Sequence, residues 1–308
     1  MITNAAFFFA SAPEKLLGYS KNFQLKNADA FYEMVDPHFS ERNFTDNNTG
    51  AEELAAQKPD LILARDIERS RLEKNLAGLN IPILFFNLEN PESYMKDIAC
   101  LGQIFAEKEK ARKINSFYQG WRNKLREMLK NKKEEDKPRV LHLFYSERNG
   151  PAAISVSPAG WIQAILVEEA GGKPVWISEN NNGNNWKKVG FDQIAAWNPD
   201  YIFVTSYFEK VDNARMKLAK NQLWKMLTAV RNNQIYSVPE DFFCWDQPDA
   251  RWILGLYWMA AMLNPDKPQL KTDLRKIFHD FYQLYGIDSK HIKLIGDLPP
   301  DLTNPKPE

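Results

Sequence analysis

Apolar residues along this chain recur with two alternating periods, one typical of helices and one typical of buried strands. The segment GAEELAAQ (50–57) has apolar residues at helical spacing, and after KPD the short run LILA (61–64) is typical of a buried parallel strand. Pro59 disfavours helical dihedrals in the residue before it, so the helix is predicted to end there. A predicted helix (69–78) and the apolar run IPILFF (81–86) follow, again a helix and then a strand. Helix, strand, helix, strand predicts an α/β layer with a parallel sheet.

The first helix–Pro-Asp–strand segment occurs again, in a similar form, 140 residues later in the chain. AEELAAQKPDLILA (51–64) aligns with FDQIAAWNPDYIFV (191–204), and Glu52 then matches Asp192 while Pro59 matches Pro199. The second half is predicted to run through strand 139–145, helix 159–170, helix 189–197, strand 201–205, helix 211–230, strand 234–238 and helix 248–263. The duplication predicts two similar α/β lobes with mainly parallel sheets and a ligand cleft between them.

One long amphipathic segment, residues 107–132, lies between the two halves. Its apolar stripe recurs every three or four residues, at Ala111, Ile114, Phe117, Trp121, Leu125 and Leu129. A helix of roughly 25 residues extends about 37 Å, which suits a rod between lobes, although a helix packed on one single domain fits the pattern equally well. We take the first interpretation, with an N-terminal lobe (1–106), a linking helix (107–132) and a C-terminal lobe (133–308).

Composition excludes several classes of function. The 308 residues include 40 basic and 40 acidic side chains. Nucleic-acid binding normally needs a dominant basic surface, so this balance argues against that function. Two cysteines, Cys100 and Cys244, are too few for a metal quartet and are expected to be buried apolar residues. No apolar run approaches the ~20 residues of a membrane span. NAAFFFASA is too short for a signal peptide and lacks its basic region, so we expect any leader to have been removed before Met1.

The residues that directly follow the predicted strands are the candidate ligand contacts, because ligands of parallel α/β sheets bind outside the carboxyl ends of the strands. The candidates are Arg65, Asp66, Tyr145, Arg148, Trp186, Tyr207, Phe243, Trp245, Asp246 and Arg251. The five aromatic members predict a wall with Arg148 and Arg251 nearby, and aromatic walls bind flat or bulky ligands. For any one of these residues taken alone, an ordinary loop position is the alternative.

The segment WDQPDARW combines a helix start with an arginine. Pro248 fits the first turn of a helix, with Asp246 as its cap. A helix amino end attracts anions, and Arg251, one turn further, would add a charge-assisted contact. An equally consistent interpretation is that Asp246 only caps the helix while Arg251 pairs with Asp249 or Glu240.

No catalytic constellation is found. The four histidines, His38, His142, His279 and His291, are dispersed, and His142 lies inside a predicted strand, where we expect a core residue. The chain has no GxSxG, P-loop or GxGxxG motif, so neither an enzyme, a cofactor nor a bare-metal site is predicted. An oxidoreductase of the nitrogenase-component type shares a similar layered fold, but it would need several cysteine ligands for its clusters.

Five motifs and the linking helix together carry a family resemblance that covers nearly the whole chain. The chain resembles the ABC-transporter solute-binding proteins of the iron-chelate and cobalamin class in GAEELAAQKPDLILA, GWIQAILVEEAGGKPVW, VGFDQIAAWNPDYIFVT, NNQIYSVPED and PDARWILGLYWMAAMLNPD. The resemblance implies two α/β lobes joined by one helix, and a monomer, periplasmic or lipid-anchored, that delivers a metal chelate from outside the cytoplasm to a permease dimer. One departure is that relatives have a signal peptide and a first strand before the first helix.

The resemblance also implies roles for single residues and a choice of ligands. In this family an acidic residue at the start of each repeated helix contacts arginines of the permease, which implies docking roles for Glu52 and Asp192. The alternative is that both are helix-start acids favoured by the dipole, worth under about 1 kcal/mol each. An anionic iron–siderophore suits an aromatic cleft with arginines. Cobalamin or haem would also use aromatic walls, and molybdate or tungstate would suit donors such as those of SENNNGNN (178–185).

Overall fold

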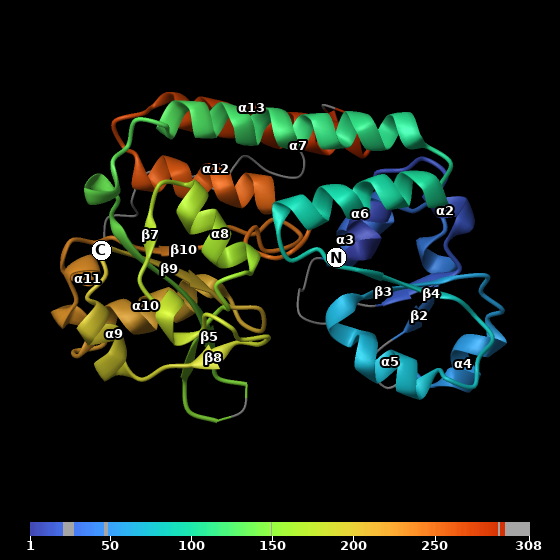
Figure 1. Ribbon diagram of the computed structural model, residues 1–308, viewed down its shortest axis with the longest axis horizontal. Coiled ribbons are helices and arrows are strands. Elements are labelled where there is room, and N and C mark those ends of the chain that lie inside the picture. Colours follow the sequence, from blue (N-terminus) through green and yellow to red (C-terminus); the bar gives the residue numbers. More distant parts are fainter. Residues whose placement is uncertain (21–27, 46–48, 149, 289, 293–308) are drawn as a thin grey trace.

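Both halves of the chain are built from parallel strands flanked by helices (Figure 1). The computed structural model describes residues 1–20, 28–45, 49–148, 150–288 and 290–292. In the first half the strands are β1 (Gly18–Ser20), β2 (Asn43–Thr45), β3 (Ile62–Arg65) and β4 (Ile83–Phe86). They form two parallel pairs, β1 with β2 and β3 with β4. The helices here are α1 (Ile2–Ala6), α2 (Ala12–Lys15), α3 (Ala28–Val35), η1 (Phe39–Glu41), α4 (Ala51–Ala56), η2 (Asp66–Glu68), α5 (Arg69–Asn75) and α6 (Pro91–Ile104).

The second half contains one six-stranded sheet in the order β10-β9-β5-β6-β8, with β7 also paired to β5. Its strands are β5 (Arg139–Ser146), β6 (Ala153–Val156), β7 (Lys173–Pro174), β8 (Lys187–Lys188), β9 (Tyr201–Thr205) and β10 (Ile235–Ser237). Among the described strands of this sheet, the pairs that involve β6 are antiparallel and the others are parallel. The helices are η3 (Glu134–Asp136), α8 (Ile162–Glu169), η4 (Ile177–Glu179), α9 (Phe191–Trp197), α10 (Val211–Lys220), η5 (Trp224–Met226), α11 (Thr228–Arg231), α12 (Trp252–Leu263) and α13 (Gln269–Leu284). The predicted α/β class with mainly parallel sheets is confirmed.

The predicted long helix is α7 (Lys108–Leu129), which lies along one side of the molecule and passes over both halves (Figure 1). It buries Ala111, Ile114, Tyr118, Arg122 and Leu125. Helix α1 adds a second connection, because the side-chain amide of Asn4 donates a hydrogen bond to Asp249. The division into lobes 1–106 and 133–308 stays a prediction.

The two copies of the repeat, residues 51–64 and 191–204, fold into the same local structure. Gly50 precedes α4 and Gly190 precedes α9, both with extended backbone. Lys58 and Asn198, which occupy the same position of the repeat, both adopt positive φ angles, 50° and 37°. This conformation ends each helix before the shared Pro-Asp, since an αR conformation is disfavoured before proline.

Two predicted helices differ from the structure. Helix α12 begins at Trp252 rather than at Pro248, and no side chain caps it. The preceding residues form turns instead, with the Asp249 N–H donating to the Gln247 carbonyl at 2.7 Å. The predicted helix 211–230 is interrupted after Lys220, because the Asn221 side chain accepts a hydrogen bond from the Leu223 N–H at 2.9 Å and so starts a new turn.

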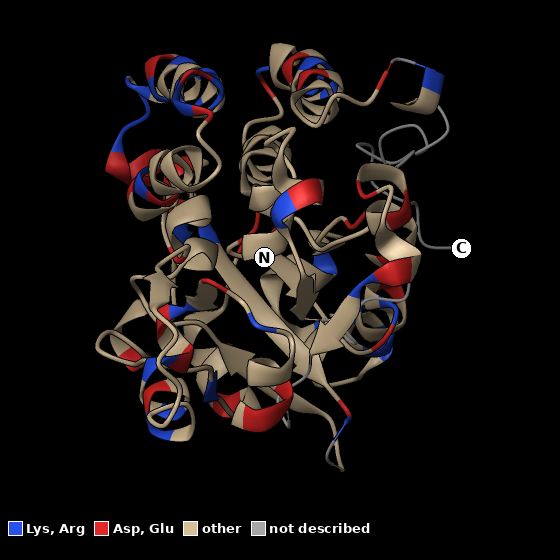
Figure 2. Cartoon of the chain, turned by 90° about the vertical axis from the view of Figure 1, so that its right-hand side faces the viewer, with Lys and Arg blue, Asp and Glu red and all other residues tan. Residues whose placement is uncertain are grey.

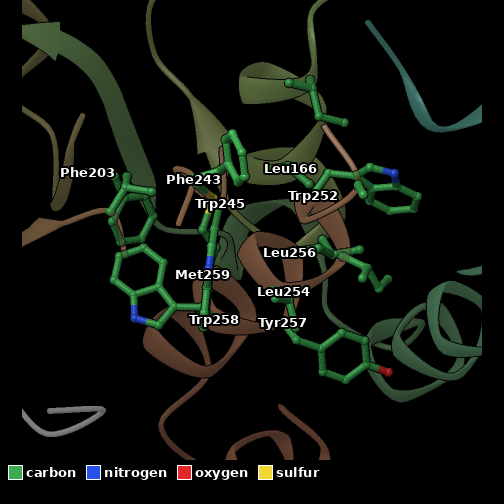
Figure 3. Close-up of a cluster of buried hydrophobic side chains, with 14 of the residues drawn as sticks. Leu166, Phe203, Phe243, Trp245, Trp252, Leu254, Leu256, Tyr257, Trp258 and Met259 are labelled. Carbon is green, nitrogen blue, oxygen red and sulfur yellow. The ribbon is translucent and has the colours of Figure 1, made fainter. Parts of the chain in front are cut away.

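The core is richest around α12, every residue of which is buried. Trp258 contacts Phe203 of β9, Trp252 faces α7, and Leu166 of α8 lies close by (Figure 3). Cys244 is buried and Cys100 is half-buried, and neither is in a disulfide. In the view of Figure 2, basic and acidic residues are interspersed along the outer helices. Among the described residues, no helix is long and apolar enough to cross a membrane.

Candidate functional site

The carboxyl ends of β5 and β9 lie side by side, because the two strands are parallel neighbours with Phe144 opposite Thr205. The loops that follow therefore start at the same edge of the sheet. They are tied together by a hydrogen bond from the Glu147 N–H to the Glu209 carboxylate at 3.3 Å. Ser206 also donates to this carboxylate, at 3.4 Å. This edge is where ligands of parallel α/β sheets bind.

Five aromatic side chains gather at this edge, and we call them the aromatic platform: Phe144, Trp161, Trp186, Tyr207 and Phe208. The Phe144 ring stacks on Tyr207, with 5.0 Å between ring centroids, and lies 5.2 Å from Trp186. Trp161 meets Trp186 edge-on at 6.0 Å. Phe144, Trp161 and Trp186 are half-buried and Phe208 is 36% exposed, so the platform keeps open aromatic surface.

Arg148 adds a positive charge to the platform. Its guanidinium carbon lies 4.6 Å from the centroid of the Phe208 ring, in a cation–π contact, and its side chain is exposed. Within the described part of the chain this guanidinium has no ion pair. An exposed arginine held on an aromatic ring is suited to bind an anionic group by charge-assisted hydrogen bonds.

Tyr145 lies on the opposite face of the sheet, because consecutive residues of a strand point to opposite faces. Its hydroxyl donates to the Glu147 carboxylate at 2.5 Å, and Lys217 donates to the same carboxylate at 2.5 Å. Burial, together with that carboxylate, raises the pKa of Tyr145, while the contact with Lys217 lowers the pKa of Glu147. Tyr145 therefore belongs to a separate hollow and is not part of the platform.

Phe243, Trp245 and Arg251 also lie away from the platform, in the core beside α12 (Figure 3 shows the two aromatic side chains). Arg251 is completely buried, and its Nε donates to Asp241 at 2.6 Å while a terminal nitrogen donates to Asp249 at 3.3 Å. Burial alone would lower the pKa of Arg251, but the two carboxylates raise it well above its ordinary value. Of the two sequence interpretations for Arg251, the structure has the ion-paired one: the predicted pair with Asp249 is confirmed, and the second partner is Asp241 rather than Glu240.

Asp246 lies beneath the platform, and the prediction that it caps a helix is wrong because α12 starts six residues later. Its buried carboxylate accepts hydrogen bonds from the Tyr207 hydroxyl at 3.1 Å and from the Thr205 hydroxyl at 3.3 Å. The Nε2 atom of His142, which is buried as expected, lies 3.1 Å away. Asp246 can therefore fix the Tyr207 ring rather than contact a ligand itself.

The first half presents Arg65 and Asp66 at the carboxyl end of β3. Arg65 is paired with Glu89, which follows β4. Asp66 is exposed and accepts a hydrogen bond from Arg69 at 2.8 Å. Behind them, burial raises the pKa of Asp97 on α6 to about 6, although a backbone hydrogen bond from Asn87 opposes that rise. Sequence reasoning did not single out Asp97.

Glu52 and Asp192 occupy matching places, as the second residue of α4 and of α9. Both side chains are exposed, and neither makes a hydrogen bond or ion pair with another described residue. The two helices lie on the side of the molecule away from α7, one in each half (Figure 1). This placement leaves both carboxylates open to a partner.

The comparison with known families is decisive for the class of protein. A family model of periplasmic binding proteins matches residues 37–242, which is more than half of the chain. The chain belongs to the periplasmic binding protein family. The predicted resemblance is thereby confirmed, and so is the prediction that the chain is not an enzyme, since this family consists of solute-binding transport proteins.

Individual relatives of this periplasmic binding protein are named after different solutes. It is 21% identical over 260 residues to the molybdate-binding protein MolA of Haemophilus influenzae, covering 78% of this chain and 70% of that one. It is 24% identical over 220 residues to the iron-uptake system-binding protein of Bacillus subtilis, covering 70% of this chain and 65% of the relative. The solved structure of MolA bound to molybdate superposes with a TM-score of 0.75 at 19% identity, covering 93% and 90% of the two chains. This likeness shows the fold.

The structure brings together only part of the residue set predicted for this periplasmic binding protein. Arg148, Trp186 and Tyr207 meet on the platform. Sequence reasoning missed Phe144, Trp161 and Phe208. The two-residue alternation along β5 could have placed Phe144 on the face opposite Tyr145, but no local pattern indicates the contact between Trp161 and Trp186, which come from different loops.

Proposed function

We propose that this periplasmic binding protein captures an anionic metal chelate with an aromatic or apolar body, a ferric siderophore first of all. The observation that carries the proposal is the exposed Arg148 guanidinium held 4.6 Å from the Phe208 ring at the edge of the aromatic platform. Aromatic surface binds the body of such a ligand, and the arginine meets its charge. The iron-uptake relative from Bacillus subtilis supports this choice.

The platform fits a bulky ligand better than a bare oxyanion. An oxyanion needs several free N–H or O–H donors, and the loop 178–185 was the predicted source. In that loop, Asn180 already donates to the carbonyls of Val156 at 3.1 Å and of Asn185 at 3.0 Å. The Asn185 side chain accepts from the Trp186 N–H at 2.9 Å, so these amides hold Trp186 in place.

Molybdate is the second candidate, favoured by the names of the Haemophilus influenzae relative and of its solved complex. Tungstate has the same chemistry. Haem or cobalamin would also stack on the platform. Like the ferric siderophores, they are flat or bulky metal chelates.

Delivery completes the proposed role. We propose that the chain works outside the cytoplasm as a monomer, free or lipid-anchored, and that Glu52 and Asp192 contact arginines of the permease dimer of an ABC importer. Support comes from their exposure, their matching positions in the repeat and their place on the side away from α7. Arg65 and Asp66 are proposed as the contribution of the first half to the ligand cleft.

The test is a titration followed by tryptophan fluorescence. The protein is titrated separately with ferric catecholate and hydroxamate siderophores, haem, cyanocobalamin and sodium molybdate. We expect saturable quenching by a ferric siderophore, because Trp186 and Trp161 lie on the platform. Arg148→Ala should weaken that affinity about tenfold, the loss typical of a charge-assisted contact.

The matched control is Arg112→Ala on α7, an exposed arginine paired with Glu109, which should leave the affinity unchanged. A response to molybdate alone would replace the chelate with the second candidate. If none of these probes binds, the ligand proposal is wrong while the family assignment stands.

A further inference from the structure

A hollow of about 590 Å³ lies beside the amino end of α9, on the opposite face of the sheet from the aromatic platform. Its walls are mainly apolar and come from β6, α9, α10 and η5. The residues that matter here are Phe191, Ile194, Leu218, Leu223 and Trp224, with Lys188 at the rim. Because Tyr145 lines this hollow from the other side of β5, it is separate from the proposed ligand site.

Large apolar side chains are exposed at this hollow and close to it in the chain. Leu223 is 54% exposed, and Met226, one turn further along η5, is 66% exposed. Phe191 is half-buried, with its ring centroid 6.1 Å from that of the buried Trp224. Exposed apolar side chains beside a hollow are typical of an interaction site for another protein.

Helix α9 carries both a wall of the hollow and the proposed docking residue of the second half. Phe191 and Ile194 line it from α9, and Asp192 lies between them in the chain with an exposed side chain. We propose that the hollow receives an apolar side chain from an extracytoplasmic loop of the permease, while Asp192 pairs with a basic residue of the same loop. The inference rests on the proposed delivery role and names the surface that performs it in this half.

Charge around the hollow defines the partner further. Lys217 is neutralised by Glu147, with 2.5 Å between Nζ and the carboxylate. Lys188 is exposed and, within the described ranges, has no ion pair. The complementary loop therefore carries an apolar residue for the hollow, a basic residue for Asp192 and an acidic residue for Lys188.

The first half differs at the matching position. Ala51 stands where the repeat places Phe191, so the surface beside Glu52 has a methyl group in place of an aromatic ring. The two halves therefore dock asymmetrically: Glu52 contributes a charge, whereas the second half contributes a charge and an apolar contact. A partner that made the same apolar contact with both halves would find no aromatic ring beside Glu52.

The test compares two exposed leucines. Leu223→Asp places a charge at the hollow, and Leu17→Asp is the matched control, because Leu17 is 49% exposed and follows α2 in the first half. Binding to the cognate permease in lipid nanodiscs is measured by biolayer interferometry. We expect Leu223→Asp to weaken binding about tenfold or more, as for a central apolar contact, and Leu17→Asp to leave it unchanged.

Further variants keep this inference distinct from the proposed function. Tryptophan quenching by the ferric siderophore should be the same in all variants. If Asp192→Ala weakens permease binding while Leu223→Asp does not, the hollow is unused and the docking role of Asp192 stands. If neither Leu223→Asp nor the double variant Glu52→Ala with Asp192→Ala weakens it, docking at this face is wrong altogether. If Leu223→Asp abolishes siderophore quenching, the hollow is a ligand site and the inference is overturned.

Discussion

The two copies of the repeat make the same local contacts and yet reach different degrees of burial. In the first, the Ile62 N–H donates to the Pro82 carbonyl at 3.0 Å, and in the second the Ile202 N–H donates to the Gln234 carbonyl at 2.9 Å. Each copy thus pairs its strand with the next strand in parallel. The local sequence is sufficient for this unit.

The neighbours of each unit account for the difference. Strand β9 pairs on its other edge with β5, and Ile202 is completely buried. Strand β3 pairs with β4 alone among the described strands, and Ile62 is only half-buried. The comparison teaches that a repeated sequence determines a repeated unit, while the layers packed around it decide how much apolar surface the unit buries.

The largest effect is expected where the two halves are linked. Arg251 pairs with Asp241 and Asp249, and Asp249 in turn accepts a hydrogen bond from Asn4 of the first half. Arg251→Ala leaves two buried carboxylates without their cation, so the free energy of unfolding should fall by about 3–5 kcal/mol. Urea unfolding followed by circular dichroism measures this loss. The exposed Arg148→Ala should change it by less than about 0.5 kcal/mol, and an equal loss in both variants would contradict the assignment.

The comparison between the two copies has a direct test in a matched pair of isoleucines. Ile202→Ala should lower the free energy of unfolding by about 3–4 kcal/mol, because it empties a fully buried site. Ile62→Ala removes the same atoms from a half-buried site and should cost about 1–2 kcal/mol. Denaturant titration of both variants checks the difference. Equal losses would mean that the neighbours of β9 do not account for its burial.

A smaller effect, dependent on pH, is expected in the first half. The pKa of Asp97 rises from 3.8 to about 6 through burial, so the folded protein binds this proton more tightly than the unfolded chain. The resulting destabilisation is absent below pH 3.8 and grows until about pH 6. Asp97→Asn should therefore be more stable than the wild type by about 1–2 kcal/mol at roughly pH 8 and no more stable near pH 3.8.

Unfolding in urea at several pH values follows this difference. The exposed Glu109→Gln on α7 serves as the control and should shift stability by less than about 0.5 kcal/mol at every pH. A constant advantage of Asp97→Asn across the whole range would show that packing, rather than the proton, is responsible.

The smallest effect on stability is expected at the two matching acids. Glu52→Ala and Asp192→Ala each remove an exposed carboxylate from the first turn of a helix, so each should cost under about 1 kcal/mol. The double variant should keep its affinity for a ferric siderophore and lose transport in a reconstituted importer. A loss of ligand affinity in this variant, measured by tryptophan quenching, would refute the docking role.

The sequence by itself determined the repeated units, the α/β class and the long helix, predicted at 107–132 and found at 108–129. Local signals suffice for these features. Helical spacing sets the buried stripe of α7. Pro59 lies between the end of α4 and β3, and Pro199 lies between the end of α9 and β9. The family could be recognised because these signals occur in a specific order.

Only the tertiary structure decided which aromatic and charged residues form a site. Tyr145 and Phe144 are neighbours in sequence but lie on opposite faces of the sheet, and Phe243 and Trp245, although they resemble the platform residues in type, are buried beside α12. Arg251 is paired with Asp241 because the packing of the 241–251 turns brings that carboxylate within 2.6 Å of its Nε. The platform contacts join residues far apart in the chain, such as Phe144 and Tyr207. The geometry of these contacts depends on how whole layers pack, which no local period of the sequence records.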